Sequence, residues 1–121
     1  MSEVRQDEGL RGERLPGLGK LTISSDRDGG RYTIRPLGEL DLATASELQH
    51  ELERAEASDA QSIVLDLSGL TFMDSTGVQL LLSAHARSRA DANRLMLLRG
   101  PAAVQRVLEL TGVATLLPFS D

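Results

Sequence analysis

Residues 62–77 of the chain read SIVLDLSGLTFMDSTG, and they combine a strand, a polar loop and the start of a helix. The first six residues are a short apolar run, which is typical of a strand buried on both faces of a sheet. Asp74 is a strong N-cap residue, so we expect a helix that begins at Ser75 and runs to about Arg89. A buried strand followed by a helix is the repeating unit of a parallel α/β sheet.

Upstream, the predicted domain opens with two strands joined by a hairpin. Lys20–Ile23 and Tyr32–Arg35 each alternate polar and apolar residues, which is the pattern of a half-buried strand. Ser24–Gly30, which lies between them, is dense in turn-forming residues. Residues 1–16 are polar and show no periodicity, so we expect a flexible N-terminal tail before a domain that spans residues 17–121.

The first helix is predicted from Leu42, where apolar residues begin to recur at the spacing of one helical face. Asp41 or Thr44 can cap its N-terminus, and the helix ends near Ala57–Asp59. The residues expected on its inner face are Leu42, Ala45, Leu48, Leu52 and Ala55.

The downstream part predicts a strand, a third helix and a short final strand. Leu95–Leu98 is the buried strand, and Thr115–Pro118 is the final one. Gly100 and Pro101 start the third helix, because proline is tolerated in a first turn, and Gly112 ends it. The residues expected on the inner face of this helix are Ala103, Val107 and Leu110.

The order of these elements predicts a single α/β domain. The hairpin is antiparallel, whereas strands joined through helices are parallel and cross over with right-handed connections. We therefore expect a small mixed β-sheet with about three to four helices packed on it.

The composition excludes several classes of function. A chain of 121 residues suits one domain, and its net charge of −5 argues against binding to a nucleic-acid backbone. The absence of cysteine excludes disulfides and thiolate metal sites, and two histidines are a poor supply of metal ligands. No apolar run approaches the roughly 20 residues that span a bilayer, and the N-terminus lacks the apolar stretch of a signal peptide. We expect a cytoplasmic monomer or weak dimer that does not bind a membrane.

Polar residues gather in two segments that follow predicted strands, Gly38–Asp41 and Asp66–Gly77, where open α/β sheets carry their functional sites. No catalytic pattern is complete there. Ser75 lacks the first glycine of G-x-S-x-G and a nearby histidine, and the only lysine, Lys20, lies in a predicted strand instead of a phosphate-binding loop. Asp66 lacks the acidic pair and the lysine of a receiver domain, so we expect it to accept backbone hydrogen bonds in the following loop. We expect no enzyme activity, cofactor or metal.

Ser75 and Thr76 have two interpretations. As first-turn residues they can simply satisfy free N–H groups of the helix. Alternatively Ser75 is a phosphorylation site, because a helix N-terminus tolerates an anion. A phosphoryl group adds about −1.5 to −2 charge beside Asp74, which would change docking instead of folding.

Gly38–Asp41, Ile63–Ser68 and Phe72–Val78 together closely resemble the bacterial anti-sigma factor antagonists of the STAS domain family, and the resemblance runs from about Leu18 to Phe119. It implies that the unphosphorylated chain binds an anti-sigma factor that is an ATP-dependent serine kinase, and so frees the sigma factor. The kinase then phosphorylates the serine after the aspartate, here Ser75, and the complex dissociates. A metal-dependent serine phosphatase restores the active form. The ATP is held by the partner.

The resemblance also implies roles for single residues. Asp74 caps the helix and helps to present the Ser75 hydroxyl, and Gly77 allows close approach by the partner's backbone. Thr76 stands where many relatives have serine and is not expected to be the principal acceptor.

Three questions stay open at this point. Glu39 and Asp41 belong either to the docking face or only to a turn and a helix cap. The acidic stretch Glu39–Asp59 either steers a partner or is a solvated face. The alternative function is a non-switching STAS scaffold or a small-ligand-binding accessory module, as in lipid-transport accessory proteins, with a small hydrolase as a weaker third option.

Overall fold

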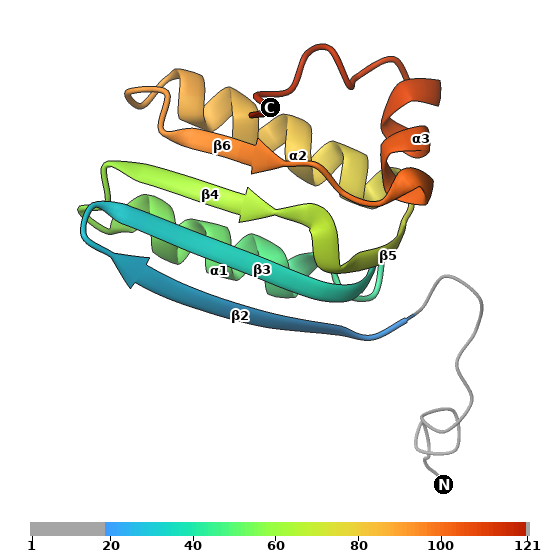
Figure 1. Ribbon diagram of the computed structural model, residues 1–121, viewed down its shortest axis with the longest axis horizontal. Helices are drawn as coiled ribbons and strands as arrows, with labels where there is room; N and C mark the ends of the chain where they lie inside the picture. Colours follow the sequence, from blue (N-terminus) through green and yellow to red (C-terminus); the bar gives the residue numbers. More distant parts are fainter. Residues whose placement is uncertain (1–18, 121) are drawn as a thin grey trace, which may run out of the picture.

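Five strands form one mixed sheet in the order β2-β3-β4-β6, and β5 pairs with the end of β3 (Figure 1). The computed structural model describes residues 19–120, so the predicted tail of residues 1–16 lies outside the described residues. β2 is antiparallel to β3, whereas β4 and β5 each pair in parallel with β3, and β6 pairs in parallel with β4. This arrangement confirms the predicted mixed sheet. The strands are β2 (Leu21–Asp28), β3 (Arg31–Leu40), β4 (Ser62–Asp66), β5 (Leu70–Met73) and β6 (Leu95–Leu98).

Three α-helices are present in the described part of the chain: α1 (Ala45–Ala57), α2 (Ser75–Arg89) and α3 (Ala102–Leu110). A short 3₁₀ turn, η2 (Leu67–Gly69), joins β4 to β5. Figure 1 shows α1 and α2 side by side behind the sheet, with α3 at the end where β5 lies. Side chains from both layers form the core, among them the fully buried Ile34, Leu48, Leu52, Leu65 and Leu81.

The hairpin is longer and tighter than predicted. Ser24–Asp28, which we expected in the turn, continues β2 and pairs with the start of β3. The turn itself is only Gly29 and Gly30, with Gly29 at φ +63°. Polar residues are accepted in this part of β2 because it is an exposed edge of the sheet, where backbone pairing does not depend on buried side chains.

β3 also runs further than predicted: it ends at Leu40 and so includes most of the polar segment Gly38–Asp41. Its first residues pair with β4 and its last three pair with β5, a strand that the sequence did not indicate. The register shifts at Gly38, which has φ +115° and whose added Cβ would lie 2.4 Å from the Lys20 carbonyl oxygen. Only glycine fits this irregular position, so Gly38 lets β3 change partner.

Two predicted helix faces need correction. Leu48, Leu52 and Ala55 of α1 are buried as expected, but Leu42 lies before the helix and is 73% exposed. The buried residues of α3 are Val104, Gln105 and Leu108. Of the face predicted for this helix, Val107 is half-buried and packs against the core as expected, but Ala103 and Leu110 are exposed.

The predicted last strand, Thr115–Pro118, is also wrong: this segment is not a strand, and a single parallel bridge follows it, between Leu97 and Phe119. Gly112 does end α3 and has φ +79°.

Candidate functional site

The N-terminus of α2 has the geometry that the sequence predicts. Asp74 is the N-cap, and its Oδ1 accepts hydrogen bonds from the amides of Thr76 at 2.9 Å and Gly77 at 3.4 Å. The amide of Asp74 donates to the carbonyl of Leu40 at 3.2 Å, which ties the cap to the end of β3. Ser75 is the first residue of the helix and is exposed. The cap therefore holds the serine at the surface in a fixed place.

Gly77 is buried, and this changes the role that we expected for it. A Cβ added at Gly77 would lie 2.7 Å from Cγ of Met73 and 3.0 Å from Cδ2 of Leu40. The close approach that glycine permits is therefore to the chain's own core, not to a partner's backbone. It allows the first turn of α2 to pack against the ends of β3 and β5.

Asp41 is also buried, so it is not part of an exposed docking face. Its Oδ2 accepts from the amide of Gly19 at 2.6 Å, and its Oδ1 accepts from the amide of Ala43 at 2.9 Å. The hydroxyl of Thr44 donates to the carbonyl of Glu39 at 2.8 Å and accepts from the amide of Asp41 at 3.0 Å. Thr44 occupies the N-cap position of α1, but its side chain makes no cap hydrogen bond. Asp41 and Thr44 therefore act together to hold the loop between β3 and α1.

Glu39 differs from Asp41 because it is half-buried and lies in β3 opposite Phe72 of β5. Its side chain lies against Gly19, where an added Cβ would overlap it. The structure thus brings Glu39, Asp41 and Asp74 to the same end of the sheet as Ser75, with Asp41 inside and Ser75 outside.

Three large apolar side chains at this end are exposed, which the sequence analysis did not predict: Leu37 (49% exposed), Leu42 (73%) and Phe72 (39%). They come from β3, the loop after it and β5, and we call them the apolar rim. Leu42 was misassigned to a helix face. The signal for Phe72 was an aromatic residue two positions before the N-cap. Exposed large apolar side chains are frequent at interaction surfaces.

A shallow groove of about 300 Å³ lies beside Thr76, between the first turns of α1 and α2. Small and polar side chains dominate its lining, including Ser46, Gln49, Gln79 and Ser83. The groove extends the exposed surface at Ser75 toward the acidic helix α1.

Two acidic side chains of α1, Glu51 and Glu56, make hydrogen bonds or ion pairs with other residues of the chain. Glu51 accepts from the Ser25 hydroxyl at 2.6 Å and from the Tyr32 hydroxyl at 2.8 Å, and Glu56 binds Arg87. Burial, followed by the hydrogen bond and negative charge of Glu51, raises the pKa of Tyr32 above its usual value. These contacts favour a structural role for two of the acids in the segment Glu39–Asp59.

Asp66 behaves as predicted, since its Oδ1 accepts from the amide of Ser68 at 3.0 Å. Within residues 19–120, no cluster of three His, Asp or Glu side chains is arranged to hold a metal ion. In the same part of the chain, no helix has the length and apolar character needed to cross a membrane.

These features define a small mixed α/β domain that presents a serine at a capped helix N-terminus. Residues 23–118 match the family model described as "Mlab, STAS domain". The chain therefore belongs to the STAS domain family.

Individual proteins of this kind resemble the chain over most of its length. The anti-sigma F factor antagonist of Paenibacillus polymyxa is 26% identical over 102 residues, which are 84% of this chain and 87% of that protein. The solved anti-sigma factor antagonist from Mycobacterium paratuberculosis superposes with a TM-score of 0.74 at 23% identity and covers 88% of both chains. Unphosphorylated SpoIIAA, also an anti-sigma factor antagonist, gives a TM-score of 0.68 at 24% identity, over 83% of this chain and 89% of its own. The two solved structures establish the fold.

Proposed function

We propose that the chain is an anti-sigma factor antagonist that is switched by phosphorylation. Its unphosphorylated form binds an anti-sigma factor serine kinase and so releases a sigma factor, and phosphorylation of Ser75 ends this binding. The observation that carries the proposal is the exposed Ser75 at the N-terminus of α2, held directly after the Asp74 cap. The name of the Paenibacillus relative supports the same role.

The position of Ser75 suits a switch that leaves the fold intact. The Asp74 carboxylate already accepts hydrogen bonds from the amides of Thr76 and Gly77, so the Ser75 hydroxyl is not needed to cap the helix. A phosphoryl group at the N-terminus of a helix is favoured by the helix dipole and points into solvent here. SpoIIAA, which shares the fold, is known in a phosphorylated form as well as an unphosphorylated one.

The same position suits a large effect on binding. Phosphorylated Ser75 and Asp74 would together place about −2.5 to −3 charges within one helical turn. Like charges brought together at an interface cost several kcal/mol, and a penalty of about 3 kcal/mol weakens binding roughly 150-fold. The apolar rim of Leu37, Leu42 and Phe72, from the same end of the sheet, would supply apolar contact area for the partner, and Glu39 is paired opposite Phe72.

In this proposal the chain is a substrate and a binding partner, not an enzyme. The kinase partner holds the ATP, so the antagonist needs no cofactor. A metal-dependent serine phosphatase removes the phosphate. The chain works in the cytoplasm as a monomer or weak dimer and binds neither nucleic acid nor membrane.

The test is phosphate mapping. The chain is incubated with a kinase-type anti-sigma factor and Mg-ATP, and the modified residue is identified by mass spectrometry. We expect phosphate on Ser75 in the wild type and in Thr76→Ala, and none in Ser75→Ala. Phosphate confined to another residue would refute the proposed switch. If the chain takes up no phosphate and the variant Ser75→Glu still binds the anti-sigma factor, the non-switching scaffold or small-ligand accessory module is favoured.

A further inference from the structure

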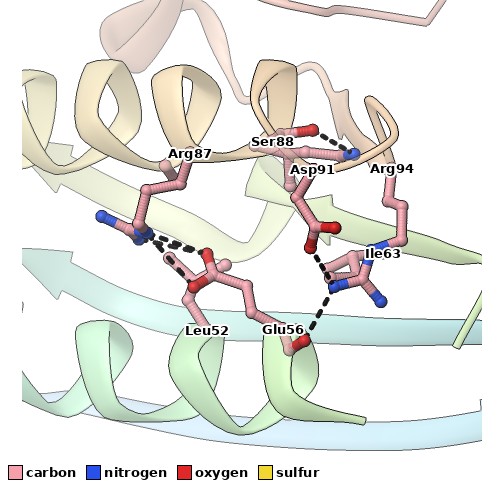
Figure 2. Close-up of a pocket in the computed structure, with 9 residues that line it drawn as sticks. Leu52, Glu56, Ile63, Arg87, Ser88, Asp91 and Arg94 are labelled. Atoms are coloured by element: carbon pink, nitrogen blue, oxygen red, sulfur yellow. Dashed lines mark hydrogen bonds and ion pairs between the residues drawn. The ribbon is translucent and has the colours of Figure 1, made fainter. Parts of the chain in front are cut away.

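A second site lies at the other end of α2, far from Ser75. A cavity of about 240 Å³ opens between the C-terminal ends of α1 and α2 and the face of the sheet that these helices cover (Figure 2). Its apolar walls are the buried side chains Leu52, Ile63, Ala84 and Leu95, one from each of α1, β4, α2 and β6. Ser88 lines this cavity and is thirteen residues from Ser75, or about 20 Å along the helix.

The cavity exists because α2 changes from large to small residues along its inner face. Leu80 and Leu81 fill the space in the middle of the helix, whereas Ala84 and Ser88 follow at the cavity. The Ser88 hydroxyl oxygen accepts a hydrogen bond from the Leu95 amide at 2.8 Å.

The mouth of the cavity is lined by charges that are already paired with each other. Arg87 binds both carboxylate oxygens of Glu56 through Nε, at 3.1 and 3.2 Å, and joins α2 to α1. Arg94 donates to Asp91 at 2.8 Å and to the carbonyls of Glu56 and Ala60 at 2.7 Å each. Figure 2 shows these two pairs on either side of the opening. The two arginines and two acids have a formal sum of zero.

We propose that this cavity binds a small, uncharged and mainly apolar molecule. A charged ligand would have to break one of the two ion pairs or bring a charge that nothing compensates, which is costly in a partly buried site. An apolar ligand only has to cover the walls of Leu52, Ile63, Ala84 and Leu95. A cavity of roughly 150 Å³ already accepts benzene, so about 240 Å³ has room for a bicyclic ring or a branched aliphatic chain.

Indole is a suitable probe, and indole-3-acetate is the same ring system with a carboxylate. Each is titrated into the isotopically labelled full chain and followed by two-dimensional NMR. We expect saturable shifts at Leu52, Ile63, Ala84 and Leu95, with direct NOEs from indole to the methyl groups of the leucines and the isoleucine. Indole-3-acetate should bind at least tenfold more weakly than indole.

The variant Ala84→Leu fills the cavity and should weaken indole binding at least tenfold. Ala86→Leu adds the same side chain on the exposed side of α2 and should leave binding unchanged. If Ala84→Leu does not fold, the NOEs in the unmodified chain decide. Shifts that do not saturate, NOEs to other residues, or equal binding of indole-3-acetate would each overturn the proposal, and none of them bears on Ser75.

Discussion

The amide of Asp74 donates a hydrogen bond to the carbonyl of Leu40, 34 residues earlier, at 3.2 Å. This bond joins the cap of α2 to the last residue of β3, and the side chain of Asp74 accepts a hydrogen bond from the Thr76 amide in the first turn of the helix. The position of Ser75 is therefore set by the sheet as well as by the helix that it begins.

Replacing Ser75 tests the charge argument directly. Ser75→Ala should keep binding to the anti-sigma factor, whereas Ser75→Glu should lower the affinity strongly, by up to about 100-fold, because it brings a fixed negative charge to the interface. Both variants should keep the melting temperature of the wild type, since the cap is Asp74. Isothermal titration and thermal unfolding provide the two measurements.

Ser24→Glu is the matched control, because Ser24 is an exposed serine on β2 outside this site. Equal loss of affinity in Ser24→Glu would show that net charge, and not its position, weakens binding. Unfolding of Ser75→Glu would contradict the argument from the helix N-terminus.

Removing the cap should cost stability. Asp74→Ala leaves the amides of Thr76 and Gly77 without their acceptor, and the free energy of unfolding should fall by about 1 kcal/mol. Asp74→Asn keeps an acceptor and should lose much less. Denaturant unfolding of the three proteins measures the difference, and equal losses in Asn and Ala would mean that the charge of Asp74 matters more than its hydrogen bonds.

Gly77→Ala should destabilise the domain through steric crowding. The added methyl group would lie 2.7 Å from Cγ of Met73, and overpacking of this kind costs about 1–3 kcal/mol. Met73→Ala makes room, so the double variant should be more stable than the sum of the two single effects predicts. Strict additivity in the double-mutant cycle would show that Met73 and Gly77 are not coupled.

The apolar rim should contribute to binding without contributing to stability. Leu42→Ser removes an apolar side chain that is 73% exposed, so stability should stay within about 0.5 kcal/mol of the wild type. Affinity for the anti-sigma factor should fall at least tenfold. Leu116→Ser, at a residue 60% exposed in the segment after α3, is the control and should bind normally. The reverse pattern would move the docking surface to the C-terminal segment.

Local sequence signals were sufficient to predict α1 and α2. Capping chemistry at Asp74 and the helical spacing of Leu48, Leu52 and Ala55 depend on residues close together in the chain, and both predictions are confirmed. β5 was missed because Leu70–Met73 shows no alternation of its own and becomes a strand only by pairing with β3.

For Asp41 the sequence left two roles open, for a similar reason. A carboxylate is ordinarily exposed, and what allows this one to be buried is the amide of Gly19, 22 residues away, together with the amide of Ala43. Such non-local partners leave no pattern in a single sequence. The same holds for the apolar rim, whose members come from two strands and a loop.

The hydrogen bond from Gly19 to Asp41 also determines where the polypeptide enters the domain. The chain reaches β2 beside Glu39, at the same end of the sheet as Ser75, whereas Ser120 lies along β6 at another edge. A tag or fluorescent protein fused directly before Gly19 would therefore lie at the same end of the sheet as the proposed docking surface. Labels for interaction assays belong at the C-terminus.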